Sequence, residues 1–305
     1  MRSDPYLIEG PALVSFSGGR TSAFMLKQIL DRGLQPDVHV LFCNTGKEDD
    51  RTLDFVRDCG EQWGVPIRWL EYRRKYLPKY KSVDVKRITK RVRRSFGLHF
   101  ENLPEGVDEP GFVEVTYATA ARTSDPPTAN HPFTNMIAMS GIPNVTTRMC
   151  TQELKIRVMK KFMRLHNYPE WTNIVGIRAD EPSRVAKLRV KPRERWENAV
   201  PLADAGVTVE DVLAFWAKQP FDLALRNDQK LGTYEGNCDL CMLKSEAKKI
   251  RLVQENPKAL DWWDSVEKAA DSPFRPKAPY AMFRRLPVVL EATVDDDLGD
   301  CICHE

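Results

Sequence analysis

Val14-Ser15-Phe16-Ser17-Gly18-Gly19-Arg20-Thr21-Ser22 is the stretch that decides the fold of this chain. The apolar run from Ala12 to Phe16 leads into it, and a helical pattern follows with its apolar residues at Phe24, Met25, Ile29 and Leu30. The sequence therefore predicts a strand, a tight glycine turn and a helix N-terminus. Glycine lets the backbone turn sharply and approach a ligand, and the free N–H groups of a first helical turn attract anions.

The side chains of this loop also suit phosphate. Ser17, Thr21 and Ser22 add hydroxyl donors, and Arg20 adds a cation that can grip a phosphate through two bonds. The loop is neither a Walker loop, G-x-x-x-x-G-K-S/T, nor a dinucleotide fingerprint, G-x-G-x-x-G. A glycine pair after a strand is also compatible with an ordinary turn, so the loop alone leaves both interpretations open.

Composition limits the class of protein. The chain has 305 residues, of which 42% are hydrophobic and 29% charged, enough for one large domain or two small ones. The sequence has no apolar stretch that would span a bilayer and no signal peptide at residues 1–5, so we expect a cytoplasmic protein without a membrane partner. Seven cysteines without an export signal favour thiols, metal ligands or redox residues over disulfides.

Strand and helix patterns alternate along the first half of the chain. Strands are predicted at 37–43 and 67–70, with a helix at 49–63 between them, and further strands at 171–177 and 199–202. This order predicts an α/β fold with a doubly wound, mostly parallel sheet. We expect a nucleotide-binding domain over residues 1–203, with a basic insertion at 73–147, and a helical C-terminal region over residues 204–305.

Charge is unevenly distributed. Residues 73–94 hold eleven Lys or Arg and one acid, Asp84, whereas residues 291–305 hold six acids and no Lys or Arg. Basic residues interleaved with tyrosines suit DNA or RNA, but a solvated insertion explains the same pattern. Residues 97–147 are rich in Pro, Gly, Thr and Asn, and we expect an irregular binding loop there. A helix is expected to begin near Arg148 and another at Thr208.

Four motifs in this chain resemble those of the PP-loop superfamily, in its phosphoadenosine phosphosulfate (PAPS) reductase-like branch, also called adenine nucleotide α-hydrolases. Residues 17–22 resemble the loop S-G-G-x-D/T-S, and Asn44-Thr45-Gly46-Lys47-Glu48 resembles the second motif. Residues 176–184, Gly-Ile-Arg-Ala-Asp-Glu-Pro-Ser-Arg, resemble the G-x-R-x-x-E-S-x-R turn, and Pro201-Leu202 the downstream Pro-Leu. The chain resembles in particular proteins of this branch from phages and other mobile elements, some of them CRISPR-associated.

The resemblance implies that the loop holds the phosphates of an adenine nucleotide. Such proteins either split ATP between the α and β phosphates, with Mg²⁺ as counter-ion, or reduce PAPS or adenosine phosphosulfate (APS). Gly18-Gly19 favours ATP, whereas Thr21 stands where ATP users commonly have Asp. The resemblance implies catalytic roles for Ser17, Arg20 and Arg178. The nucleotide-binding residues that it implies are Ser17, Gly18, Gly19, Arg20, Thr21, Ser22, Asn44, Thr45, Gly46, Gly176 and Arg178.

The cysteines bear on the choice between ATP cleavage and sulfonucleotide reduction. Cys150 and the C-x-x-C pair Cys238 and Cys241 match three of the four cluster ligands of APS reductases, and Thr151 replaces the fourth. With Cys303 or Cys301 as the missing ligand, they would hold a 4Fe–4S cluster or Zn²⁺. A reducible Cys238–Cys241 pair without metal is the alternative.

Three functions follow from these observations. The first is an ATP pyrophosphatase that adenylates an acceptor or supports sulfur transfer. The second is a sulfonucleotide reductase in which Cys301, in Asp300-Cys301-Ile302-Cys303-His304, forms a thiosulfonate that a thiol carrier such as thioredoxin releases. The third is an accessory protein with reduced turnover that binds nucleotide, and DNA or RNA through residues 73–94. The oligomeric state stays open between a monomer and a homodimer.

Overall fold

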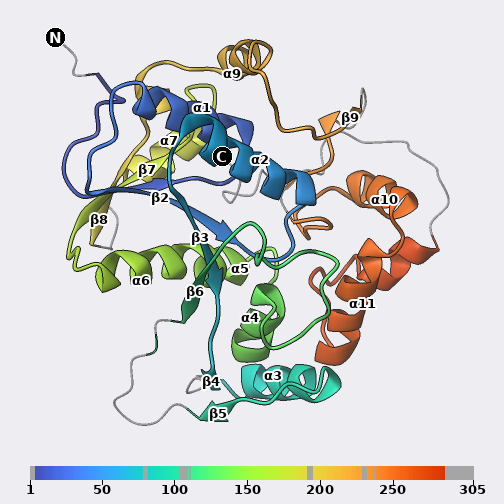
Figure 1. Ribbon diagram of the computed structural model, residues 1–305. Coiled ribbons are helices and arrows are strands. Elements are labelled where there is room, and N and C mark those ends of the chain that lie inside the picture. The colour runs from blue at the N-terminus through green and yellow to red at the C-terminus, as the bar shows by residue number, and fades with distance from the viewer. Residues whose placement is uncertain are drawn as a thin grey trace.

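The computed structural model describes residues 4–77, 82–102, 109, 111–190, 195–228, 232–236 and 238–285. The fold is α/β, with a six-stranded, mostly parallel mixed sheet and C-terminal helices (Figure 1). The strands of this sheet are β1 (Ala12–Ser15), β2 (Val38–Asn44), β3 (Ile67–Tyr72), β6 (Phe112–Val115), β7 (Trp171–Val175) and β8 (Trp196–Ala199). Their order is β6-β3-β2-β1-β7-β8, and β6 alone runs antiparallel to its neighbour.

Helices cover both faces of the sheet. Helices α1 (Arg20–Leu30) and α2 (Asp50–Trp63) lie on one face, and α6 (Arg157–Leu165) lies on the other (Figure 1). Side chains alternate along β1, so that Ala12 and Val14 belong to the core under α1 and α2, while Leu13 belongs to the core under α6. The doubly wound sheet predicted from the sequence is confirmed.

The remaining elements surround this sheet. The helices are α3 (Val83–Ser95), α4 (Pro132–Ser140), α5 (Met149–Thr151), α7 (Pro182–Arg189), α8 (Pro201–Asp204), α9 (Val209–Trp216), α10 (Glu246–Glu255) and α11 (Ala259–Ala270). A π-helical turn, η1 (Gln152–Ile156), joins α5 to α6, and η2 (Tyr280–Arg284) is a 3₁₀ turn. Two small ladders pair β4 (Tyr76–Leu77) with β5 (Glu101–Asn102), and β9 (Asn227–Asp228) with β10 (Gly232–Thr233).

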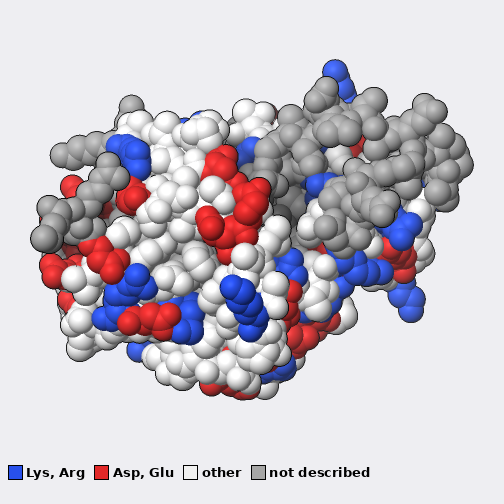
Figure 2. Space-filling model, turned by 90° about the horizontal axis from the view of Figure 1, so that it is seen from above, with Lys and Arg blue, Asp and Glu red and all other residues white. Residues whose placement is uncertain are grey.

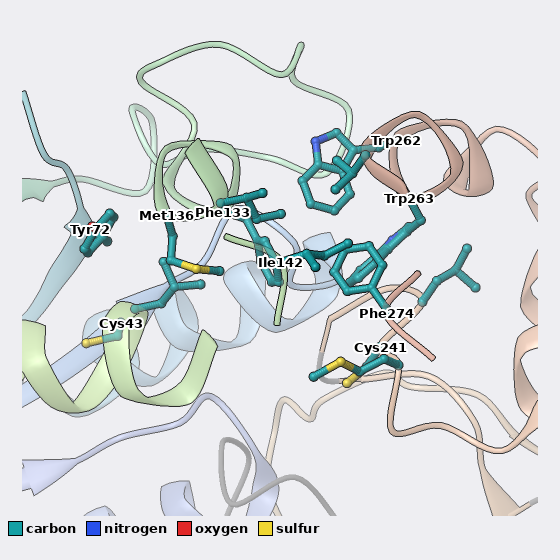
Figure 3. Close-up of a cluster of buried hydrophobic side chains, with 14 of the residues drawn as sticks. Cys43, Tyr72, Phe133, Met136, Ile142, Cys241, Trp262, Trp263 and Phe274 are labelled. Atoms are coloured by element: carbon teal, nitrogen blue, oxygen red, sulfur yellow. The ribbon is translucent and has the colours of Figure 1, made fainter. Parts of the chain in front are cut away.

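The described C-terminal residues complete both cores of the sheet. Trp216 of α9 packs in the core under α1 and α2, and Trp263 of α11 packs in the core on the opposite face. Figure 3 shows the second contact, with Trp262 and Trp263 close to Phe133 of α4. The boundary predicted at residue 203 therefore crosses two continuous cores in the part of the chain that the structure describes.

Two expectations about local structure are wrong. Residues 97–147 are not irregular throughout, because they contain β6 and the buried helix α4, which begins with Pro132 after the N-cap His131. The strand expected at 199–202 ends at Ala199, and Pro201 begins α8 instead. Proline favours the first position of a helix, which explains both helix starts. Among the described residues, no helix has the length and apolar character needed to cross a membrane.

Candidate functional site

The chain reverses its direction across the sheet between β1 and β7. From β1 it proceeds outward to β2 and β3, and later returns to the other side of β1 with β7 and β8. In open α/β sheets, the carboxyl ends of the strands on the two sides of such a reversal form a crevice that holds ligands. The loops after β1 and β7 are residues 16–19 and 176–181, and both carry predicted site residues.

The loop after β1 is held in shape by its own hydroxyl groups. Ser17 and Ser22 are joined through their Oγ atoms at 2.8 Å, and the Ser22 hydroxyl donates to the Gly19 carbonyl at 3.0 Å. Gly19 is the N-cap of α1 and has no side chain with which to cap the helix. The amides of the first turn, residues 20–22, therefore keep the donor capacity that suits an anion.

Gly18 cannot be replaced in this loop without strain. Its φ of 79° lies in the left-handed region, and a Cβ there would be 2.8 Å from Thr52 Cγ2 and 2.9 Å from Val56 Cγ2. Phe42 of β2 approaches the same position to 3.2 Å. The loop is thus packed directly against β2 and α2, which fixes the position of the helix N-terminus behind it.

Arg178 connects the loop after β7 to the N-terminus of α1. Its Nη1 donates to Thr21 Oγ1 at 3.2 Å across 157 residues of sequence, and its Nε donates to Asp180 Oδ1 at 2.9 Å. The Arg178 side chain is 15% exposed, and Gly176 before it is buried. The carboxylate of Glu181, whose side chain is 10% exposed, accepts from the Arg178 amide at 3.1 Å. The guanidinium is therefore held in place at the entrance of α1.

Arg20 is held by a partner that the sequence did not indicate. Its Nε and Nη2 both donate to Asp222, at 2.7 and 2.5 Å, and Nη2 also donates to the Leu223 carbonyl at 3.0 Å. A role for Arg20 in gripping phosphate, as expected from the sequence, therefore requires either Nη1 or the opening of this ion pair. The C-terminal segment around Asp222 is thus joined to the loop after β1.

The second motif forms a buried node. All of Asn44–Glu48 is buried, and Asn44 Nδ2 donates to Glu71 Oε1 at 2.7 Å and to the Ala121 carbonyl at 2.9 Å. Glu48 Oε2 accepts from the Thr45 amide at 2.8 Å and from the Thr45 hydroxyl at 2.6 Å. These side chains are engaged within the protein, so any nucleotide contact predicted for Asn44, Thr45 and Gly46 would have to use backbone groups.

The side chains of Lys47 and His131 also belong to this buried node. Lys47 is 1% exposed, with Nζ 3.2 Å from Asp239 Oδ2 and 4.7 Å from the centre of the Trp262 ring. His131 Nε2 lies 3.2 Å from the Gly46 carbonyl, and Nδ1 accepts from the Thr134 amide. Burial, together with the Lys47 charge, lowers the pKa of His131 to about 4. The neutral tautomer with a proton on Nε2 satisfies both of these contacts.

A cavity of about 240 Å³ begins at Ser17 and extends between the sheet and α6. Its walls are mainly apolar and are formed by Leu13, Ser15, Phe16, Ser17, Cys43, Thr151, Lys155, Ile156, Met159, Lys160, Trp171, Asn173, Val175, Leu188, Trp196 and Asn198. The π turn η1 contributes Lys155, whose Nζ is 3.5 Å from Glu48 Oε1 of the buried node. π turns inside helices are frequent at functional sites.

The sequence analysis did not identify several residues of this cavity. Ser15, Asn173 and Asn198 lie on three neighbouring strands and face the same space. One feature of the sequence could have indicated these residues: asparagine stands inside two strands, where it is uncommon. Because their contacts cross strands that are distant in sequence, the sequence alone does not bring them together.

The predicted metal ligands lie near the C-x-x-C turn. Cys238 Sγ is 3.7 Å from Thr45 Oγ1, and the Cys238 and Glu48 backbones form an isolated bridge. Figure 3 shows Cys241 in the core with Phe274 and Trp263, apart from Cys43. Cys150 is partly buried against the same core.

In the described part of the chain, no three His, Cys, Asp or Glu side chains are grouped as metal ligands. Cys301 and Cys303 lie outside the described residues. The 4Fe–4S cluster or Zn²⁺ therefore stays a prediction from cysteine spacing.

Two proteins are similar to this chain over most of its length. The chain is 33% identical over 253 residues to the uncharacterized nin region protein ORF290 of Escherichia phage lambda. The matched region covers 81% of this chain and 71% of the phage protein. It is 23% identical over 264 residues to the uncharacterized protein MJ0066 of Methanocaldococcus jannaschii, covering 85% of this chain but only 42% of the archaeal protein. No family model matches the sequence.

Proposed function

This chain belongs to the family of the phage lambda nin region protein ORF290, and we propose that it is a PAPS reductase-like PP-loop enzyme that cleaves ATP between the α and β phosphates. One observation carries the proposal. The uncapped N-terminus of α1 and the guanidinium of Arg178 meet at Thr21, beside the point where the strand order reverses. Backbone donors, a fixed cation and a crevice are what a nucleotide phosphate requires.

The proposed reaction is a displacement at the α-phosphorus. An oxygen of an acceptor, or of water, attacks this phosphorus, and the bond from it to the oxygen that bridges to the β-phosphate breaks. The electron pair leaves with pyrophosphate, the acceptor keeps AMP, and its proton passes to solvent. The amides of residues 18–22 and the Arg178 guanidinium would stabilise the charge that develops on the leaving group. Mg²⁺ enters with ATP as part of the substrate.

The cavity that begins at Ser17 provides space for the base of the nucleotide. An apolar cavity of about 150 Å³ accommodates benzene, so about 240 Å³ accommodates a bicyclic purine. The phosphates would then lie at residues 17–22 and the base between the sheet and α6. ATP is favoured over PAPS or APS because Gly18 and Gly19 keep the loop sequence of ATP users.

Product analysis tests this function. Purified protein with Mg-ATP should release AMP and pyrophosphate, and Ser17→Ala and Arg178→Met should reduce the rate at least tenfold. Ser95→Ala, at the exposed end of α3, is the matched control and should leave the rate unchanged. Absence of AMP from wild-type protein, together with unchanged ATP binding by Ser17→Ala, would refute the proposal.

The exposed face of α3 supports a second proposal, that the protein is associated with DNA or RNA. Lys86, Lys90 and Arg94 are exposed and spaced four residues apart, so they form one row along the helix. The face of the molecule seen in Figure 2 instead carries a compact group of acidic side chains near its centre. A row of cations at one end would contact the phosphates of a nucleic-acid strand.

Salt dependence distinguishes this binding from a merely solvated helix. Replacing Lys86, Lys90 and Arg94 by Gln should weaken binding of a single-stranded oligonucleotide. The decrease of log affinity with log salt should become less steep, by about 2 in the slope. Replacing the exposed Lys218, Lys258 and Lys277 by Gln changes the net charge equally and is the control. Equal effects of the two triple variants, or no binding at low salt, would contradict this proposal.

A further inference from the structure

One segment of the C-terminal part, residues 207–223, is connected to both arginines of the proposed phosphate site. The segment contains α9, which packs on α1 (Figure 1). Near its end, Asp222 accepts from Arg20 Nε and Nη2. Near its start, the carboxylate of Asp180 joins the segment to Arg178. Each arginine is therefore held by a carboxylate that lies in this segment or is bound to it.

The two oxygens of Asp180 have different partners. Oδ1 accepts from Arg178 Nε at 2.9 Å, and Oδ2 accepts from the Val209 amide at 3.1 Å. Val209 is the first residue of α9, where a backbone N–H has no partner within the helix and where a negative charge is favoured. The Ala179 amide also donates to the Val207 carbonyl at 2.8 Å. Asp180 is thus fixed against the start of α9 by its side chain and by the backbone beside it.

These contacts set the orientation of the Arg178 guanidinium. Its Nε is held by Asp180, and its Nη1 donates to Thr21 Oγ1 at 3.2 Å in the first turn of α1. Because the guanidinium is planar and rigid, contacts at both Nε and Nη1 determine which way it faces. Arg20 differs, because Asp222 engages both its Nε and its Nη2. Asp180 therefore directs its arginine toward the phosphate loop.

Glu181 contacts the same arginine but acts on the backbone of the turn. Its Oε2 accepts from the Arg178 amide at 3.1 Å, and its Oε1 accepts from Arg184 Nη1. Arg178 Nη2 is 3.6 Å from Glu181 Oε2, beyond hydrogen-bond distance. The Glu181 side chain is 10% exposed, whereas that of Asp180 is 32% exposed. Glu181 shapes the turn, and Asp180 orients the guanidinium.

We infer that Asp180 is a positioning residue of the ATP-cleaving site. It anchors the Arg178 guanidinium to the N-terminus of α9, so that the cation faces Thr21 before a nucleotide binds. The inference rests on the proposed function. A cation that is already in place stabilises the charge on the departing pyrophosphate without first losing side-chain freedom, which lowers the barrier to the reaction.

A double-mutant cycle on AMP release tests the inference. Asp180→Asn keeps the shape of the side chain, but an amide cannot accept from both Arg178 Nε and the Val209 amide at their present positions. Because the substitution also removes a negative charge, KM for ATP should stay within about threefold while kcat falls about tenfold. In an Arg178→Met background the same substitution should change kcat by less than about twofold, because no guanidinium remains to be oriented.

The chain offers a closely matched control. Asp58 on α2 also accepts from an arginine, Arg57 Nε, at 2.9 Å, and its side chain is 33% exposed. Asp58→Asn therefore removes the same charge from the same kind of pair outside the proposed site, and it should leave kcat and KM unchanged.

The Nε–H signal of Arg178 in NMR spectra tests the contact without turnover. In wild-type protein without nucleotide, this signal, identified by its loss in Arg178→Met, should exchange slowly with water. The exchange should become faster in Asp180→Asn but not in Asp58→Asn.

The outcomes separate the inference from the proposed function. An unchanged or higher kcat for Asp180→Asn, equal losses of kcat in both backgrounds, or an Nε–H exchange that the substitution does not alter would overturn the inference and leave the proposed function intact. If wild-type protein releases no AMP from Mg-ATP, the proposed function fails and the inference fails with it.

Discussion

Two glycine loops follow adjacent parallel strands of this protein, yet they are built in opposite ways. The loop at residues 16–19 is shaped by backbone geometry and by the packing of Gly18 on α2, and it leads into the N-terminus of α1, which no side chain caps. The loop at residues 44–48 is shaped by side chains, and its Asn, Lys and Glu groups are all buried. Similar glycine signals in sequence therefore precede two different structures, an uncapped helix N-terminus that we propose as an anion site and a closed structural node.

The difference follows from what each loop contacts. The first lies where the strand order reverses and borders the cavity at Ser17. The second lies between β3 on one side and the C-terminal segment on the other, where the Asp239 amide donates to the Lys47 carbonyl at 2.7 Å. Substitutions in the closed loop should therefore reduce stability, whereas substitutions in the open loop should mainly change ligand binding.

The largest effect is expected for Lys47→Met. Methionine fills a similar volume but leaves Asp239 without its buried cation, and removal of one partner of a buried ion pair costs about 3–5 kcal/mol. Urea unfolding should show this loss in the free energy of unfolding. Lys27→Met breaks the half-exposed Lys27–Asp31 pair and is the control, with a loss of about 0–1 kcal/mol. Equal losses in both variants would contradict the description of the second loop as a closed node.

Gly18→Ala should be the next most damaging change. The methyl group would meet Thr52 and Val56 below 3.0 Å in addition to the strain of a positive φ, for a total of about 2–4 kcal/mol. Gly33→Ala measures the strain alone, because Gly33 has a φ of 89° and no atom within 4 Å of the added carbon. Thermal unfolding of both proteins should place Gly33→Ala at about 1–2 kcal/mol. A Gly18→Ala protein as stable as Gly33→Ala would show that the loop does not pack on α2.

Acid should weaken the closed loop through His131. Because burial lowers the folded-state pKa of this imidazole from 6.5 to about 4, the unfolded chain binds the additional proton between these pH values. The stabilisation is complete above pH 6.5 and decreases as the pH falls to 4, by at most about 1.4 kcal/mol per pH unit. His131→Asn keeps a residue that can cap α4, and it should be less stable than wild type at pH 7 by more than it is at pH 4.5. A difference between the two proteins that does not change with pH would contradict a buried neutral His131.

The smallest effect is expected from Asp222→Asn at the open loop. The substitution frees the Arg20 guanidinium, adds one net positive charge near the α1 N-terminus, and should tighten ATP binding about two- to fivefold at low salt. Because the pair is partly exposed, the gain should disappear at about 0.3 M salt. Titrations at two salt concentrations measure it. Weaker binding would indicate that Asp222 instead holds Arg20 in the orientation that ligand binding needs.

The sequence predicts the layered sheet well because local patterns determine it. Apolar runs bounded by glycine specify β1, β2 and β7, and Thr208 with Asp211 forms the capping box that begins α9, at the residue expected for it. Helix α4 was missed because it is buried on nearly every side, polar Thr134 and Asn135 included, so it lacks the periodicity of a helix with one face in water. Its signals were Pro132 at the first turn and His131 before it.

The sequence predicts the candidate site only where the shape of the site depends on the backbone. Glycines 18 and 19 indicate the proposed phosphate loop, and Gly18 takes a positive φ that other residues adopt much less readily. The Arg20–Asp222 pair and the hydrogen bonds that join Ser15, Asn173 and Asn198 depend on side chains up to 202 residues apart, which meet only in the folded sheet. The type of residue at a position thus predicts which contacts its side chain can make, whereas the tertiary fold determines which partner it contacts.

Amide chemical shifts measured during an ATP titration test the central claim most directly, because the claim concerns backbone N–H groups. We predict that the largest changes occur at residues 18–22 and 176–178, with little change at residues 44–48, and that Ser17→Ala reduces them at equal ATP concentration. Changes confined to α3 or to residues 44–48, with residues 18–22 unaffected by ATP, would contradict the assignment of the α1 N-terminus as the phosphate site.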